Sequence, residues 1–200
     1  MIRAILFDLG RVIVPFDFNR AYARIEALGG IQASEVAARI LPTGLMQKYE
    51  SGEIETGDFV RRMSDLCGIE VSFEVFDELW NSIFPRETIV SEELVAALAE
   101  RYRLVLVSNT NPLHFAMIRE NYPILRHFHS LVLSYEVGAM KPAAKIYRRA
   151  VEAAGCRPEE CFFTDDMASY VEGAREHGID AVQFVSAVQL EAELKRRGVI

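Results

Sequence analysis

Four short stretches of the chain carry polar residues that could bind a metal and an anion. In chain order they hold Asp8 after AILF, Ser108 and Asn109 after LVLV, Lys141 in KP, and Asp165 with Asp166 after CFFT. Taken singly, an aspartate after a strand more often forms a turn or caps a helix. Four such positions in succession favour one shared site over four separate turns.

The charges of these residues limit what the site could hold. Two carboxylates ~4 Å apart repel by about 4 kcal/mol at an effective dielectric of about 20, so Asp8, Asp165 and Asp166 need a compensating cation. Their oxygen ligands suit Mg²⁺, which takes one or two carboxylates, waters and a substrate phosphate. Lys141 and the backbone N–H groups after Ser108 would donate to the anion. We therefore expect Mg²⁺ as the cofactor and a small phosphorylated metabolite as the partner.

Strand patterns alternate with helix patterns in the part of the chain that carries these residues. Apolar runs predict five buried strands, at residues 4–7, 104–107, 131–133, 161–164 and 181–185. Apolar periodicity predicts helices at residues 92–102, 143–154, 170–177 and 188–197. This alternation is typical of a doubly wound α/β fold with a parallel sheet covered on both faces. In such folds ligands bind outside the carboxyl ends of the strands, where the four stretches would meet.

Residues 16–90 interrupt this alternation. They show helix patterns at 21–28, 59–67 and 73–84 and no strand pattern, which predicts an all-helical domain inserted into a core of residues 1–15 and 91–200. Trp80 and Phe84 could line the substrate face of the insert, but their spacing on one helix face favours its core. The stretch QKYESGEIETGDF is interpreted as a turn broken by Ser51 and Gly52, and we expect no chemistry from it.

Composition argues against several classes of protein. A net charge of −7 without a Lys/Arg-rich stripe argues against nucleic acid as a partner. Three cysteines without a CxxC spacing favour neither a disulfide framework nor a zinc site and suit a cytoplasmic location. His127 and His129 lack further ligand-type neighbours and are expected in a solvated loop. No apolar run reaches the ~18 residues of a membrane span, so we expect no membrane contact.

The stretches FDLGRV, VSNT, KP and FFTDD resemble the four motifs of the haloacid dehalogenase-like (HAD) hydrolase superfamily, and together they span nearly the whole chain. The resemblance implies a five-stranded Rossmann-like core and a helical cap that closes over the substrate. It implies that Asp8 is the nucleophile that forms an aspartyl-phosphate. Ser108 and Lys141 would hold the phosphoryl oxygens, with Asn109 also at the substrate. The implied activity is that of a Mg²⁺-dependent phosphatase acting on a small phosphomonoester such as a sugar phosphate, in a monomer or weak homodimer.

The resemblance also implies a ligand set for the metal. Asp8, Asp166 and Asp165 would provide carboxylates, and Gly10 would provide its backbone carbonyl. Family members usually carry Asn or Asp four residues after the second acid, where it supports the lysine or the metal shell. This chain has Tyr170 there. Because losses in the outer shell commonly cost about 10 to 100-fold in metal affinity or activity, we expect a weaker metal site.

Gly10 departs from the family pattern, in which an aspartate protonates the leaving alcohol and later activates water. The nearest resemblance is to a bacterial branch of sugar-phosphate phosphatases that includes an α-glucose-1-phosphate phosphatase, where this motif also reads DLG. Since an anomeric hydroxyl is more acidic than an ordinary alcohol, we expect sugar 1-phosphates to be preferred over 6-phosphates. Asp17 is a candidate base, although its position before FNRAYA favours a helix N-cap.

Two alternatives to a phosphatase stay open on these residues. One is a metal-independent 2-haloacid dehalogenase, which uses the same aspartate nucleophile. The pair Asp165 and Asp166 argues against it, because two uncompensated acids would repel a carboxylate substrate. The other is a non-catalytic binding domain that kept the HAD fold, which the departures at Gly10 and Tyr170 would favour.

Overall fold

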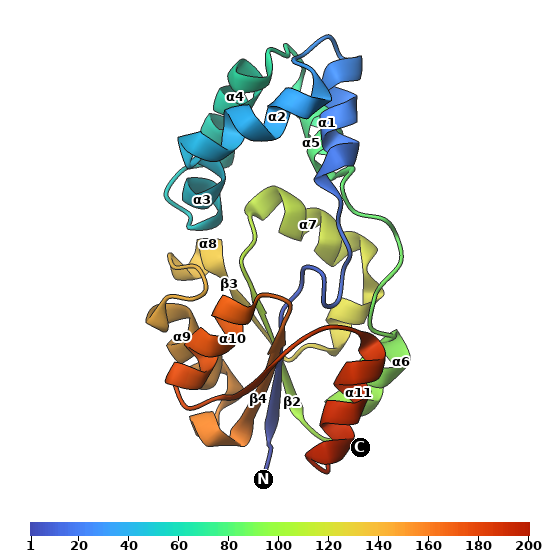
Figure 1. Ribbon diagram of the computed structural model, residues 1–200, viewed down its shortest axis with the longest axis vertical. Helices are drawn as coiled ribbons and strands as arrows, with labels where there is room; N and C mark the ends of the chain where they lie inside the picture. The colour runs from blue at the N-terminus through green and yellow to red at the C-terminus, as the bar shows by residue number, and fades with distance from the viewer.

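Five parallel strands form the centre of the computed structural model, which describes residues 1–200 (Figure 1). The strands are β1 (Ala4–Phe7), β2 (Arg103–Ser108), β3 (Ser130–Leu133), β4 (Cys161–Asp165) and β5 (Asp180–Gln183). Their spatial order is β3-β2-β1-β4-β5, so β1 pairs with both β2 and β4. This arrangement confirms the predicted doubly wound parallel sheet, and it sets the ends of β1, β2 and β4 side by side.

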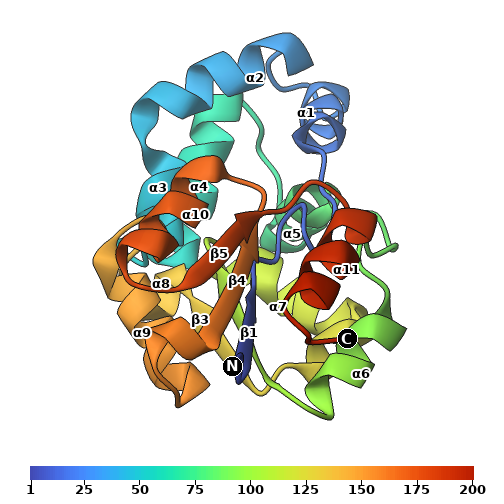
Figure 2. The same cartoon turned by 60° about the horizontal axis from the view of Figure 1, so that its bottom comes forward.

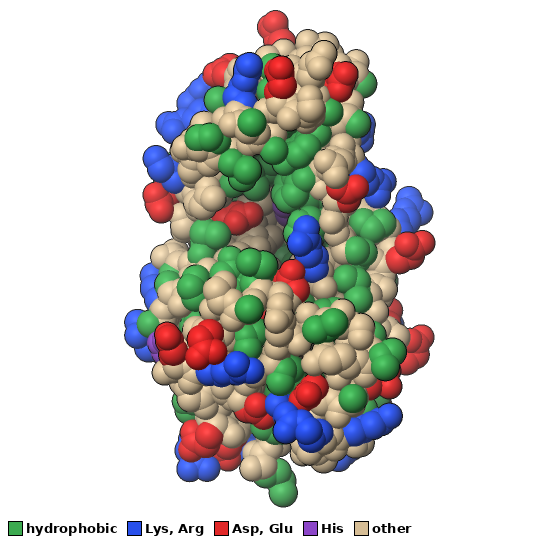
Figure 3. Space-filling view, in the orientation of Figure 1, with side chains coloured by type: hydrophobic (Ala, Val, Ile, Leu, Met, Phe, Trp, Pro, Cys, Tyr) green, Lys and Arg blue, Asp and Glu red, His purple; other side chains and the backbone are tan.

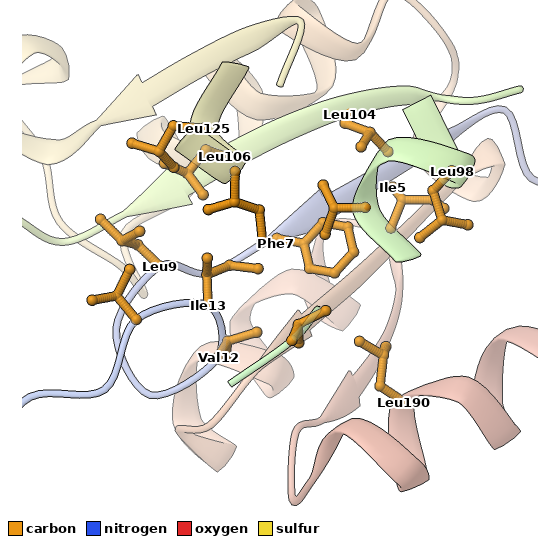
Figure 4. Packing of buried hydrophobic residues seen from close by; sticks show 14 of the residues in the cluster. Ile5, Phe7, Leu9, Val12, Ile13, Leu98, Leu104, Leu106, Leu125 and Leu190 are labelled. Atoms are coloured by element: carbon orange, nitrogen blue, oxygen red, sulfur yellow. The ribbon is translucent and has the colours of Figure 1, made fainter. Parts of the chain in front are cut away.

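Helices cover both faces of this sheet because successive strand side chains point to opposite faces. The covering helices are α6 (Glu92–Ala99), α7 (Pro112–Asn121) and α11 (Ala187–Arg196) on one face, and α9 (Ala144–Ala154) and α10 (Ala168–Glu176) on the other. Ile5 and Phe7 of β1 pack into the first layer (Figure 4), whereas Ala4 and Leu6 pack into the second. With both faces buried, the ends of the strands are the part of the sheet that a ligand can reach.

Five helices between β1 and β2 form a separate layer beyond the carboxyl ends of the strands, which we call the cap (Figures 1 and 2). They are α1 (Phe18–Ala27), α2 (Ala33–Ile40), α3 (Leu45–Glu50), α4 (Thr56–Cys67) and α5 (Phe73–Asn81). The cap has an aromatic core, in which Tyr49 stacks on Phe59 with ring centroids 4.0 Å apart. Trp80 is buried there, as expected, at 5.3 Å from Phe59. The helical insert is confirmed, while its boundaries at residues 16 and 90 stay a prediction.

The cap touches the core at two places. Helix α5 packs against α7, where Nε2 of His114 lies 3.3 Å from the carbonyl oxygen of Trp80. Helix α3 packs against the short helix α8 (Ser134–Val137) of the core. The turn after α3 lies so close to α8 that a Cβ on Gly52 would collide with the carbonyl oxygen of Tyr135. Since Gly52 also has a φ of 73°, the turn requires glycine on both counts.

Several element ends differ from the expectation. The helix predicted at 73–84 ends at Asn81, since Ser82 Oγ donates to the Leu79 carbonyl oxygen and Pro85 soon follows. The strand predicted at 181–185 ends at Gln183. The stretch QKYESGEIETGDF is a turn only over residues 51–55, and its flanks belong to α3 and α4. Helices α2, α3, α7 and α8 were missed, as were three short 3₁₀ helices at Leu41–Thr43, Pro123–His127 and Pro158–Glu160.

Candidate active site

Two strand ends and one loop bring a buried lysine between two carboxylates. Asp8 follows β1, Asp165 ends β4, and Lys141 lies in the loop between α8 and α9. The Nζ of Lys141 donates to Asp8 Oδ1 and to Asp165 Oδ2, at 2.6 Å each. All three residues are at most 6% exposed. Residues far apart in the chain thus meet at the carboxyl ends of the two central strands.

Burial governs the proton affinities of this cluster. It raises the pKa of Asp8 to about 7, against the opposing effect of the Lys141 charge and with a further rise from Asp165. Burial alone would lower the pKa of Lys141, but the two carboxylates outweigh it and the pKa rises, so the lysine stays charged. A single ammonium group therefore faces at least two carboxylates, and the cluster is short of positive charge.

Asp166 adds a third carboxylate to the cluster. One oxygen from each of Asp8, Asp165 and Asp166 lies within 4.8 Å of the others. Burial raises the pKa of Asp166, Asp165 raises it further, and Arg11 opposes the rise. The second oxygen of Asp165 accepts the backbone N–H of Met167 at 2.9 Å, so both oxygens of this residue have protein partners. The donor set contains only oxygen and lacks positive charge, which fits a hard cation such as Mg²⁺, with Asp8 and Asp166 less engaged than Asp165.

The end of β2 provides a hydroxyl and a clamp. The Ser108 hydroxyl has one long bond within the chain, 3.4 Å to the Asn109 carbonyl oxygen, and can donate to an anion. The Asn109 side chain holds the lysine loop instead: Oδ1 accepts the N–H of Lys141 at 2.7 Å and Nδ2 donates to its carbonyl oxygen at 3.1 Å. The next N–H, that of Thr110, donates to Ser134 Oγ at 3.0 Å. Ser108 and Lys141 are thus better placed to hold an anion than the Asn109 side chain.

Tyr170 supports Lys141 through its ring. The Nζ of Lys141 lies 5.2 Å from the ring centroid, where the negative face of the ring attracts an ammonium group. The Tyr170 hydroxyl accepts from Asn109 Nδ2 at 3.3 Å, and its backbone carbonyl oxygen accepts from the Tyr147 hydroxyl at 2.7 Å. The position where Asn or Asp was expected therefore joins the lysine to its clamp.

A cavity of about 80 Å³ lies between the core and the cap, and Figure 3 shows a hollow between the two halves of the molecule. Its wall includes the two residues after Asp8 and the end of β2, whereas Asp8, Lys141 and the pair Asp165 and Asp166 do not line it. The core contributes Leu9, Gly10, Ser108, Asn109, Thr110, His114 and Ile118 to its wall, and the cap side contributes Phe16, Phe18, Glu50, Ile83 and Phe84. Glu50, the last residue of α3, is the single acidic side chain among them. No sequence motif marks this glutamate, because only the packing of α3 on α8 brings it to the cavity.

Gly10 lies against the ring of Phe16. A Cβ on Gly10 would lie 2.8 Å from Cε1 of Phe16, whose ring fills the space. The left-handed backbone lies one residue later, at Arg11 with a φ of 57°, and the Arg11 guanidinium lies 5.0 Å from the centroid of the Phe16 ring. Asp17 is the N-cap of α1, as favoured, since its Oδ1 accepts the N–H of Asn19 at 3.0 Å. Asp17 is not part of the cavity wall.

The histidines have structural partners. His127 Nε2 lies 3.1 Å from Glu92 Oε1, and His129 Nδ1 accepts the N–H of Leu104 at 3.0 Å. His129 lies in an exposed loop, as expected, whereas His127 is half-buried at the end of a 3₁₀ helix. His114 was passed over by the sequence reasoning and lies in the cavity wall. Burial lowers its pKa to about 3, so it stays neutral.

These features define a doubly wound α/β protein with a helical insert over an acidic site at the carboxyl ends of the strands. A model of the haloacid dehalogenase-like hydrolase family matches residues 2–178, so the chain belongs to that family. No helix is both long and apolar enough to cross a membrane.

Similar proteins come from two bacteria. D-ribitol-5-phosphate phosphatase of Bacteroides thetaiotaomicron is 29% identical over 200 residues, covering 97% of each chain. A HAD family enzyme of the same organism, solved with magnesium and inorganic phosphate, has a TM-score of 0.84 at 28% identity, covering 93% of this chain and 96% of that one. A HAD-like hydrolase of Porphyromonas gingivalis has a TM-score of 0.82 at 25% identity, covering 98% of both chains.

Proposed function

We propose that this protein is a Mg²⁺-dependent phosphatase that hydrolyses a small phosphomonoester, a sugar or sugar-alcohol phosphate, through an aspartyl-phosphate on Asp8. The observation that carries the proposal is the buried Lys141 Nζ, 2.6 Å from both Asp8 and Asp165 and beside Asp166. Two similar proteins support it, one named for D-ribitol 5-phosphate and one solved with magnesium and inorganic phosphate. A small phosphorylated metabolite is then the partner.

The residues of the cluster divide the chemistry among them. A carboxylate oxygen of Asp8 bonds to phosphorus as the bond to the alcohol oxygen breaks, and water later attacks phosphorus to release phosphate and free Asp8. Ser108 and Lys141 donate to the phosphoryl oxygens and offset their charge in the transition state. Mg²⁺ held by Asp8, Asp166 and the Gly10 carbonyl would add the positive charge that the cluster lacks. Asp165 holds Lys141 in place.

The cavity bears on the choice of substrate. Its volume of about 80 Å³ and its largely apolar cap wall suit a small alcohol. D-ribitol 5-phosphate, named for the similar phosphatase, is an ester of a primary alcohol. The expected preference for sugar 1-phosphates, and the likeness to α-glucose-1-phosphate phosphatase, therefore stay predictions. The expected oligomeric state, a monomer or weak homodimer, also stays a prediction.

The dehalogenase alternative fits the site less well. Three carboxylates around one lysine disfavour a carboxylate substrate unless a cation is bound. The binding-domain alternative is weakened by Tyr170, because Lys141 keeps its support there without the expected Asn or Asp. A single panel of substrates distinguishes the phosphatase from both alternatives.

The panel comprises sugar 1-phosphates, sugar 6-phosphates, D-ribitol 5-phosphate and 2-chloropropionate, each with Mg²⁺ and with EDTA. We expect phosphate release that EDTA abolishes, and a loss of at least about 10³-fold in kcat for Asp8→Asn, because this variant lacks the nucleophile. Circular dichroism and thermal unfolding check that the variant is folded. EDTA-resistant chloride release would identify a dehalogenase, and phosphate binding without turnover of any ester would identify a binding domain.

A further inference from the structure

Cleavage of an aliphatic phosphate ester requires a proton for the leaving oxygen, and the core offers no acidic side chain at the cavity. Gly10 has no side chain, and the Phe16 ring occupies the space of one. His114 is neutral, and its two ring nitrogens contact the Asn111 amide and the Trp80 carbonyl oxygen. Among the residues of the cavity wall, Glu50 is left as the group that can exchange a proton near neutral pH.

The fold holds Glu50 against the core. It is the last residue of α3, the cap helix that packs on α8. Two residues later, Gly52 lies against the backbone of Tyr135, so α3 cannot approach the core more closely. Glu50 therefore shares the wall of one small cavity with Ser108 and Gly10, and its charge is felt at Tyr170, whose ring faces Lys141.

The Glu50 carboxylate makes no contact that stabilises the fold. No hydrogen bond or ion pair joins it to another residue, and burial is the sole cause that raises its pKa, to about 7. Its place at the carboxyl end of α3 also disfavours the charged form, since the helix dipole is negative there. Burying an acid that has no hydrogen-bond partner lowers the stability of the folded protein, which points to a role for Glu50 in the cavity.

We propose that Glu50 is the proton donor and acceptor of the phosphatase reaction, an inference that rests on the proposed function. As the bond between phosphorus and the alcohol oxygen breaks, its electron pair stays on that oxygen, and the Glu50 carboxyl gives the oxygen its proton. Phosphorus bonds at the same time to Asp8. When water attacks the aspartyl-phosphate, the Glu50 carboxylate takes a proton from that water, and both residues return to their starting states.

Leaving-group dependence tests this role in the full-length enzyme with Mg²⁺. The variant is Glu50→Gln, and the matched control is Glu55→Gln, an exposed acid at the other end of the same turn. The probes are D-ribitol 5-phosphate, n-butyl phosphate and p-nitrophenyl phosphate. For both alkyl esters we expect kcat of Glu50→Gln to fall about 10² to 10⁴-fold, with little change in KM and no change in the control.

The aryl ester separates the two half-reactions. Its p-nitrophenolate leaves without a proton, so Glu50→Gln should release about one equivalent of p-nitrophenolate in a burst and then turn over slowly, because hydrolysis of the aspartyl-phosphate has lost its base. Equal alkyl-ester rates in variant and wild type would overturn the role. So would a loss confined to D-ribitol 5-phosphate, which would make Glu50 a ligand of substrate hydroxyls. A wild-type enzyme inactive on all three esters would instead refute the proposed function.

Discussion

The core and the cap build the two sides of the cavity in different ways. On the core side three side chains have two hydrogen-bond partners each: Lys141 binds two carboxylates, Asp165 uses both oxygens, and Asn109 clamps the lysine loop. On the cap side the wall is mainly aromatic and aliphatic, and its one acid, Glu50, has no partner. Groups that act on the phosphoryl oxygens are thus fixed before substrate binds, whereas the cap excludes water and meets the alcohol.

Substituting Lys141 breaks the core side of this comparison and should have the largest effect. Lys141→Ala removes a donor to the phosphoryl group, so we expect kcat/KM to fall about 10² to 10³-fold, to the same extent for 1-phosphates and for primary phosphates. It also leaves Asp8 and Asp165 buried without their cation, which should cost about 3 to 5 kcal/mol of stability. Steady-state kinetics and denaturant unfolding measure the two effects, with the exposed Lys145→Ala as control.

The pH dependence of that stability loss has a defined sign. The pKa of Asp8 is raised in the folded state, to about 7, so folding favours the protonated form of Asp8. The stability that protonated Asp8 contributes is lost as pH rises through about 7. In Lys141→Ala no ammonium group opposes the rise in the Asp8 pKa. The free energy of unfolding of this variant should therefore approach that of the wild type at pH 5 and fall furthest below it at pH 8. A loss independent of pH, or a loss of activity on one substrate class alone, would contradict this view of the core.

The two sides also differed in how far the sequence predicted them. Asp8, Ser108, Lys141, Asp165 and Asp166 follow strands or open a helix, and a parallel sheet gathers strand ends at one edge, so local pattern and topology sufficed to group them. The structure brings these residues together. Their individual roles still rest on the experiments proposed above.

The cap resisted prediction for a physical reason. Its helices α2 and α3 are only 8 and 6 residues long, too short for apolar periodicity to stand out. Glu50 sits beside a glycine turn that looks like an ordinary surface loop, and its burial depends on the contact between Gly52 and Tyr135. Likewise, the crowding of Gly10 by Phe16 is a tertiary contact that no spacing in the sequence shows.

Moving the acid from the cap to the core would sharpen the comparison. Gly10→Asp alone should destabilise the protein by about 1 to 3 kcal/mol, because its Cβ meets the Phe16 ring. Gly10→Asp with Phe16→Ala makes room, and in a Glu50→Gln background it should recover at least about tenfold in kcat on n-butyl phosphate, since a core carboxyl can then protonate the leaving oxygen.

Phe16→Ala in the Glu50→Gln background is the control for added space, and kinetics on sugar 1-phosphates and 6-phosphates accompany the melts. A restored acid should help 6-phosphates more than 1-phosphates, because the primary alcohol leaves less readily without a proton. If a stably folded triple variant binds both esters but gains no rate on either, residue 10 cannot deliver a proton, and the leaving-group explanation of Gly10 fails.

The smallest effect should come from removing the hydroxyl of Tyr170, which joins the lysine to its clamp within the core. Tyr170→Phe removes the hydroxyl that accepts from Asn109 at 3.3 Å but keeps the ring 5.2 Å from Lys141 Nζ, so we expect a loss of about 0.5 to 1.5 kcal/mol in stability and only a few-fold change in kcat. Tyr170→Ala removes the ring as well and should weaken Mg²⁺ affinity or kcat by about 10 to 100-fold. Thermal unfolding, Mg²⁺ titration of activity and KM for D-ribitol 5-phosphate distinguish the two variants. Equal losses of kcat in Tyr170→Phe and Tyr170→Ala would assign the support to the hydroxyl. If Tyr170→Ala behaves like the wild type, the core holds Lys141 through Asp8, Asp165 and Asn109 alone.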